Sequence, residues 1–211
     1  MSLIKERIGK LISDLEPLIY PDSEIVEHYR MIRTKERFKD VRCLDTSAWE
    51  EFDQRQIWGG HREYYWFETC VTIPERFAGK FVVFEVKTGA EGGWDANNPQ
   101  FTIYVNGERV QGLDVNHREI VISRNAEAKK LYRIVLSAFT GDSNFSLRLD
   151  SRLKVLDPET EHYYYDLSVP YNTARLLDSQ DQDYIRIIQA LNSSLNLLDL
   201  REEASAAYRE S

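Results

Sequence analysis

Trp94, Asp95, Asn97 and Asn98 combine an aromatic ring with polar groups in one short segment. An indole face stacks on the apolar face of a pyranose ring, while carboxylate and amide groups hydrogen-bond the sugar hydroxyls. The segment 91–98 therefore predicts a sugar-binding loop or the rim of an active site. The alternative is structural: the Asp and Asn side chains bond to their own backbone, and Trp94 packs against one end of the fold.

Four acidic residues are candidates for the two carboxylates that hydrolysis of a glycosidic bond requires. They are Glu85, Glu91, Asp95 and Asp114. Nothing in their spacing marks a pair, and solvated loop acids are far more common than catalytic ones. The signatures of serine nucleophile elbows, phosphate-binding loops and zinc proteases do not occur in the sequence. We therefore expect no catalytic residue within these 211 residues.

The tripeptide His-Arg-Glu occurs twice, at 61–63 and at 117–119. Residues two apart in a strand face the same side, so each copy could present an imidazole and a carboxylate together. If the two copies met, four ligands would surround a metal ion. However, spacing fixes no third ligand beside either copy, and the tripeptide is also ordinary surface strand material. We predict no metal site.

Composition restricts the class of protein. A net charge of −8 disfavours nucleic acid and anionic membrane surfaces as partners, while 42% hydrophobic and 12% aromatic residues suit a packed core. The only cysteines, Cys43 and Cys70, have no metal-type spacing and indicate a reducing cytoplasm without a disulfide framework. The N-terminus is too charged for a signal peptide, and no apolar run approaches the length of about 18 residues that suggests a membrane span.

Short segments rich in Val, Ile, Phe, Tyr and Thr fill residues 38–156, and turn residues separate them. Asn106-Gly107 predicts a two-residue hairpin turn, which places Phe101, Ile103 and Val105 on one face and Thr102 and Tyr104 on the other. The pattern is typical of a mainly β protein. We expect an antiparallel β-sandwich of the jelly-roll, galactose-binding-like type, with N-terminal and C-terminal helices.

Apolar residues at three- and four-residue steps predict helices over 3–15 and, after a cap at Ser179 or Asp181, over 182–200. A further short helix is predicted from Ser23 to Arg33, and an irregular stretch after Pro158. The expected organisation has three parts. These are an N-terminal helical segment at 1–36, the β-sandwich at 37–157, and an irregular segment with a linker helix at 158–211 that leads to an absent catalytic domain.

The cluster Trp58, Tyr64, Tyr65, Trp66 and Phe67 gives one strand aromatic residues on both faces. A strand that is apolar on both sides is expected to be covered on both sides. Either thick packing within the sandwich or a neighbouring domain would provide the second cover.

Residues 57–86 and the hairpin that follows resemble the N-terminal region of alpha-mannosidases of glycoside hydrolase family 38, in its cytosolic and bacterial branch. The matching motifs are Trp58-Gly59, Trp66-Phe67, Ile73-Pro74-Glu75, Asn106-Gly107 and Gln111-Gly112-Leu113. The resemblance implies a β-sandwich ahead of a zinc-dependent catalytic α/β barrel. The His-x-His-x-Asp type zinc motif of that barrel does not occur in this sequence, so no catalytic or zinc residue is transferred.

The resemblance also implies a function. The chain would be the non-catalytic N-terminal domain of an alpha-mannosidase, a glycosidase that removes terminal alpha-D-mannose residues from glycans. It would pack on its own catalytic domain, in a longer polypeptide that holds zinc, and could take part in a homo-oligomer. The alternative is a carbohydrate-binding module that contacts mannosides through residues 91–98.

Overall fold

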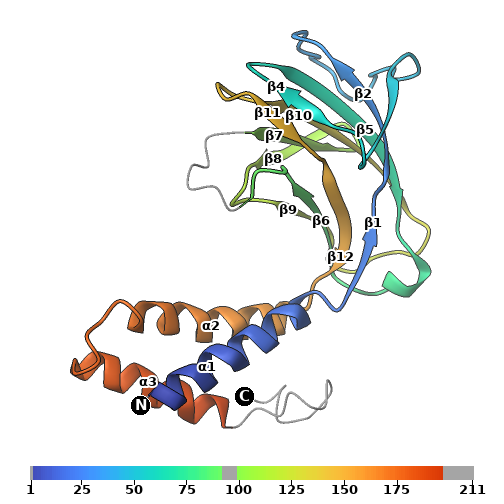
Figure 1. Cartoon of the computed structure of the whole chain (residues 1–211). Coiled ribbons are helices and arrows are strands. Elements are labelled where there is room, and N and C mark those ends of the chain that lie inside the picture. Colours follow the sequence, from blue (N-terminus) through green and yellow to red (C-terminus); the bar gives the residue numbers. More distant parts are fainter. Residues whose placement is uncertain (1, 92–98, 197–211) are drawn as a thin grey trace. The chain divides into compact units, whose positions relative to one another are not determined.

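The computed structural model describes residues 2–91 and 99–196. The chain divides into two compact units, a helical unit within Met1–Pro21 and Leu156–Ser211, and a β unit, Asp22–Val155 (Figure 1). The strands Asp22–Ile25 and His28–Arg33 thus belong with the β unit and not with an N-terminal helical segment reaching residue 36.

The β unit is an antiparallel sandwich, as predicted. The four-stranded sheet has the order β1 (Asp22–Ile25), β12 (Asp150–Val155), β6 (Val82–Lys87) and β9 (Glu119–Ser123). The six-stranded sheet has the order β3 (Glu50–Asp53), β2 (His28–Arg33), β5 (Tyr64–Thr72), β10 (Leu131–Phe139), β7 (Gln100–Val105) and β8 (Glu108–Leu113). A small third sheet pairs β4 (Trp58–Gly60) with β11 (Phe145–Leu147), and a 3-10 turn, η2 (Glu75–Phe77), follows β5.

The core of the sandwich lies between the two large sheets. Phe67, Ile103 and Ile134 of the six-stranded sheet and Phe84 and Leu153 of the four-stranded sheet are fully or almost fully buried in it. Their neighbours along each strand point the other way, because successive side chains of a strand alternate between faces. Figure 1 shows β12 and β6 side by side, and their register pairs Leu153 with Phe84.

The β7–β8 hairpin confirms the turn predicted from Asn106-Gly107. Both residues have positive φ, 51° and 84°, which is the conformation that a tight two-residue hairpin turn needs. The predicted faces are also confirmed, because Phe101 and Ile103 lie in the core while Tyr104 packs on the opposite face.

The short helix predicted from Ser23 to Arg33 is wrong, because these residues form β1 and β2. β1 pairs with β12 so that Asp22 lies opposite Val155. Tyr29 of β2 is buried in the core, where its hydroxyl hydrogen-bonds Ser151 and where burial raises the pKa of Tyr29. Pairing between distant strands therefore overrides the mixed local pattern of charged and apolar residues.

The helical unit contains α1 (Ser2–Leu15), a 3-10 turn η1 (Glu16–Ile19), α2 (Pro158–Ala174) and α3 (Gln182–Leu195). The helix predicted at the N-terminus is confirmed, and so is the one predicted after Asp181 as far as Leu195, while residues 197–200 of that prediction lie outside the described residues; the Asp181 side chain caps α3. The apolar side chains along one face of α1 and of α3 are buried in a shared core with α2. The buried set includes Ile8, Ile12 and Leu15 of α1 with Tyr184, Ile188, Leu191 and Leu195 of α3.

The irregular stretch predicted after Pro158 is wrong, because this region forms α2. Asp157 caps the helix by accepting hydrogen bonds from the amides of Glu159 and Thr160, and Pro158 occupies the first turn, where proline is favourable. The backbone amide of Asp157 also donates to Ile19 O at 2.9 Å, which joins η1 to the start of α2. None of the helices in residues 2–91 and 99–196 is long and apolar enough to cross a membrane.

Gly9 gives a test of the packing of α1 on α2. A Cβ atom at this position would lie 2.5 Å from Oη and 3.2 Å from Cζ of Tyr171, whose hydroxyl donates to Lys5 O. In an open helix Gly→Ala stabilises by about 1 kcal/mol. Here we expect Gly9→Ala to destabilise by about 1–3 kcal/mol because the Tyr171 ring must move.

Urea unfolding followed by circular dichroism measures this change. Tyr171→Phe in the Gly9→Ala background should recover part of the loss, since it removes the nearest atom. A Gly9→Ala protein that is more stable than the parent would show that the two helices are not in this contact.

Candidate functional site

The outer face of the six-stranded sheet carries side chains in rows across the strands, because directly paired residues point to the same side. The first row is Tyr64, Phe139 and Gln100. The second row is Trp66, Ser137, Thr102 and Gly112. The third row is Glu68, Val135 and Tyr104. Beyond Trp66, the second row contains only small residues between two rows with larger ones.

This difference in side-chain size creates a groove with a volume of about 610 Å³. Ser137, Thr102 and Gly112 form its floor, the first row lines one side, and Tyr104 lines the other. The segment Lys35, Glu36, Arg37 and Phe38, which follows β2, also lines the groove.

Aromatic rings are available on both sides of the groove. The rings of Tyr64 and Phe139 lie 4.7 Å apart between centroids with an interplanar angle of 30°, and both residues are half-buried. Tyr104, also half-buried, stacks on Trp66 at 6.1 Å. Trp66 itself is only 5% exposed, so it shapes the wall and offers little surface to a ligand.

The segment 34–49 covers the part of this outer face around Trp66 and Val135. Its residues Phe38, Val41 and Trp49 pack in one apolar cluster with Trp66 and the fully buried Val135. The prediction that the aromatic strand is covered on both sides is confirmed, and the second cover is this segment of the same chain.

Arg133 of β10 fixes the covering segment to the sheet. Its guanidinium group donates to Val41 O at 3.0 Å and Leu44 O at 2.8 Å, and it also pairs with Glu68 Oε1 at 3.1 Å. Arg133 and Glu68 are largely buried, with 23% and 12% of their side chains exposed, so these bonds are shielded from water.

The polar groups of the groove are mixed in type and balanced in charge. Ser137 and Thr102 offer hydroxyl groups and Gln100 an amide, while Lys35 and Arg37 balance the acids Glu36 and Asp114. Although partial burial raises the pKa of Asp114, backbone hydrogen bonds from His117 and Asn116 lower it, and its net value lies below the usual range.

A second hollow, of about 710 Å³, lies over β2, β3 and the distal end of β5. Its outer-face lining is charged, with His28, Arg30, Glu51, Asp53 and Glu68. Tyr29 and Phe52, the aromatic residues of its lining, are core residues that are 3% exposed each. The hollow therefore lacks the accessible aromatic surface that the first groove has.

The residues predicted as a sugar-binding loop or active-site rim, Trp94, Asp95, Asn97 and Asn98, lie outside the described residues. That prediction stays a prediction. The groove residues Tyr64, Phe139, Gln100, Thr102 and Ser137 were not predicted as a site. Only the aromatic cluster around Trp66 pointed to this face, because the register that joins β5, β10 and β7 cannot be read from the sequence.

The other candidate acids have structural partners. Glu85 pairs with Lys154 at 3.2 Å in a largely buried position. Glu91 accepts hydrogen bonds from the Gly89 amide and the Thr88 hydroxyl, and Asp114 accepts from the amides of its own turn. These bonds assign the three carboxylates to the stability of strands and turns.

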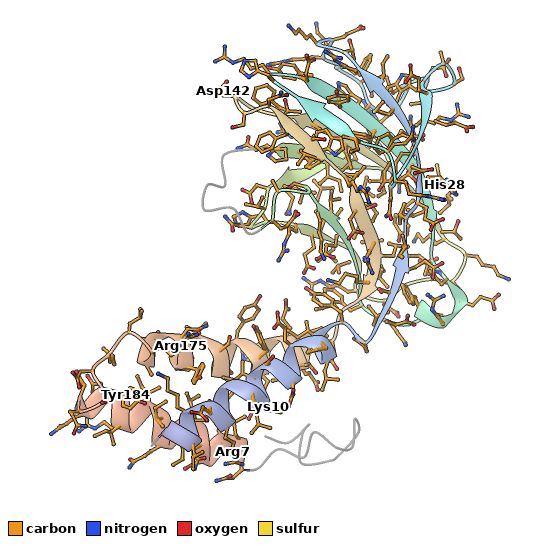
Figure 2. The ribbon with its side chains drawn as sticks, in the orientation of Figure 1. Arg7, Lys10, His28, Asp142, Arg175 and Tyr184 are labelled. Carbon is orange, nitrogen blue, oxygen red and sulfur yellow. The ribbon has the colours of Figure 1, made fainter. Side chains whose placement is uncertain are left out.

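The two His-Arg-Glu copies have separate surroundings. His61 Nδ1 lies 2.7 Å from Asp142 O, and Glu63 binds Arg33, whereas His117 contacts Asp114. Figure 2 shows that Asp142, whose carbonyl contacts His61, lies apart from His28 in the β unit. In residues 2–91 and 99–196, no three His, Cys, Asp or Glu side chains are grouped to hold a metal ion.

Cys43 and Cys70 are free, exposed thiols. Burial and the neighbouring Glu68 carboxylate raise the pKa of the Cys70 thiol, which disfavours the nucleophilic thiolate form.

No model of a protein family matches this sequence, and no curated protein matches it. Similar solved structures include a Bacteroides uniformis beta-glucuronidase (16% identity, TM-score 0.45) and a Ruminococcus gnavus beta-glucuronidase (11%, 0.46). They also include a glycosyl hydrolase family 2 member from Bacteroides cellulosilyticus (16%, 0.47). The matches cover 63%, 64% and 64% of this chain and 18%, 29% and 21% of theirs, so the chain spans less than a third of their length.

The predicted membership in glycoside hydrolase family 38 is wrong. No family model supports it, and the similar structures are beta-glucuronidases and a family 2 member instead of alpha-mannosidases. Two of the short motifs behind the prediction have a local structural explanation. Asn106-Gly107 forms a hairpin turn and Trp58 packs in the sandwich core, which any antiparallel sandwich can require.

Arg133 provides a test of how the covering segment is held. Arg133→Ala removes the donors to Val41 and Leu44 and the ion-pair partner of Glu68. Loss of such charged hydrogen bonds costs about 1–3 kcal/mol. We expect trypsin to cleave at Lys39 and Arg42 about tenfold faster or more, because local opening becomes more frequent.

The far-UV circular dichroism spectrum should change little in this variant. Arg124→Ala, an exposed arginine that follows β9 and packs on Phe81, is the matched control and should be cleaved at Lys39 and Arg42 like the parent. Equal cleavage of Arg133→Ala and the parent would show that apolar contacts alone hold the segment.

Proposed function

We propose that this chain is a non-catalytic β-sandwich module of a carbohydrate-active enzyme, and that the groove on its six-stranded sheet binds a glycan. The observation that carries the proposal is the pair of rings Tyr64 and Phe139 beside a floor of hydroxyl groups. A pyranose needs both an aromatic surface for its apolar face and polar groups for its hydroxyls.

The sheet register places these groups at suitable positions. Phe139 has Tyr64 directly across on β5 and Gln100 directly across on β7. Tyr64 therefore supports one side of the ring, and the amide of Gln100 borders the other. Ser137 and Thr102 occupy the next row, where their hydroxyl groups can donate and accept hydrogen bonds.

The balance of charge in the groove favours a neutral ligand. Two basic and two acidic residues line it, so it has no net attraction for phosphate or for a polycation. The polar floor also differs from the mainly apolar pockets that bind hydrophobic small molecules. A neutral saccharide matches both properties.

Two apolar surfaces that could serve for docking on a catalytic domain are both buried within the chain. The α3 stripe is buried against α1 and α2, and the outer face around Trp66 is buried under the segment 34–49. Glycan binding is therefore the function that we favour, and association with a catalytic domain of a longer chain remains a secondary proposal.

A panel of oligosaccharides tests the proposal by isothermal titration calorimetry. We use cellohexaose, xylohexaose, mannohexaose, laminarihexaose and maltohexaose, and we expect saturable binding of at least one. Phe139→Ala should weaken that binding about tenfold, since aromatic contacts contribute about 1–1.5 kcal/mol. Gln100→Ala, which changes an exposed residue, should weaken it without affecting the fold.

Leu131→Ala is the matched control, because Leu131 is an exposed apolar residue at the other end of β10. It should bind like the parent protein. The proposal is overturned if no member of the panel binds, or if Phe139→Ala and Gln100→Ala bind as tightly as the parent.

A further inference from the structure

The groove is a trough that runs across four strands along the second row of side chains. From Trp66 on β5 it passes Ser137 on β10 and Thr102 on β7 to Gly112 on β8. Three spacings between neighbouring strands give a length of about 14 Å, which suits roughly three sugar units. The two ends of this trough are built differently.

The end at β5 is closed. Phe38 packs edge-on against Trp66 at 5.1 Å, and the Trp66 indole donates to Glu36 O at 3.3 Å. The row continues beyond Trp66 with Ile32 of β2, which is packed in the same apolar cluster. A sugar chain that enters along the trough therefore meets a wall formed by the sheet and the covering segment.

Within residues 2–91 and 99–196, the end at β8 is open. β8 is the edge strand of the sheet, and Gly112 leaves the trough without a side chain at this point. Among the described residues, a Cβ atom at Gly112 would meet only Phe101 O, at an ordinary 3.7 Å, and the residue has no positive φ. Neither the backbone conformation nor the described packing around Gly112 requires a glycine. The consequence of having no side chain here is that the exit from the groove over β8 stays free.

We infer that the groove receives the terminal units of a glycan chain, while the rest of the chain leaves over β8. This inference rests on the proposed glycan binding and adds a preference for chain ends. A groove open at both ends would accept internal units of a long chain as well. Here the wall at Trp66 and Phe38 allows only an end to occupy the inner part.

The number of protein molecules bound per glycan chain tests this inference. For the panel member that binds, calorimetry is carried out with its disaccharide, its hexasaccharide and a polymer of known chain length. A chain-end site predicts one protein molecule per chain at every length. A number of bound molecules that increases with chain length would overturn the inference while leaving glycan binding intact.

Gly112→Trp tests the exit with a variant whose fold should be undisturbed. We expect it to weaken binding of the hexasaccharide about tenfold and to leave the disaccharide unaffected. Val110→Trp, at an exposed position of the same edge strand outside the groove, should leave both unaffected. Equal effects of Gly112→Trp on the two sugars would contradict the inference that the glycan chain leaves the groove over β8. If no sugar bound at all, the proposed function would be overturned together with this inference.

Discussion

The guanidinium group of Arg133 holds the segment 34–49 on the outer face of the six-stranded sheet. Backbone carbonyls of this segment would otherwise face the sheet without these donors, and the largely buried carboxylate of Glu68 would lose its ion-pair partner. With the segment in place, Val135 is fully buried and Trp66 becomes the wall of the groove. The site thus depends on a side chain that need not contact a ligand.

The shape of the groove follows from the register of three strand pairs. Small residues share one row, and rings such as Phe139 and Tyr104 occupy the rows beside it. A shift of β7 by one residue would bring Phe101 and Ile103 outward and send Thr102 into the core. Burial of these apolar residues therefore enforces the register, and the register places the hydroxyl groups of the floor.

Local patterns predicted the features that depend on few neighbours, such as the Asn106-Gly107 turn and the helix that Asp181 caps. They failed at β1 and β2, where strand partners come from distant segments, as in the pairing of β1 with β12. The capping pair at Asp157 and Pro158 was present in the sequence but was not used to place α2. The groove could not be predicted, because only the fold brings β5, β10 and β7 into register.

Asp22 and Val155 are paired residues at the outer ends of β1 and β12, so the sandwich begins and finishes at adjacent backbone positions about 5 Å apart. In the helical unit, the residues next to the same junctions are likewise joined, through Ile19 and Asp157. The sandwich therefore has the geometry of a domain that can be inserted into another protein. Inserted into a surface loop of an unrelated host protein, it would leave the host's loop ends almost where they were.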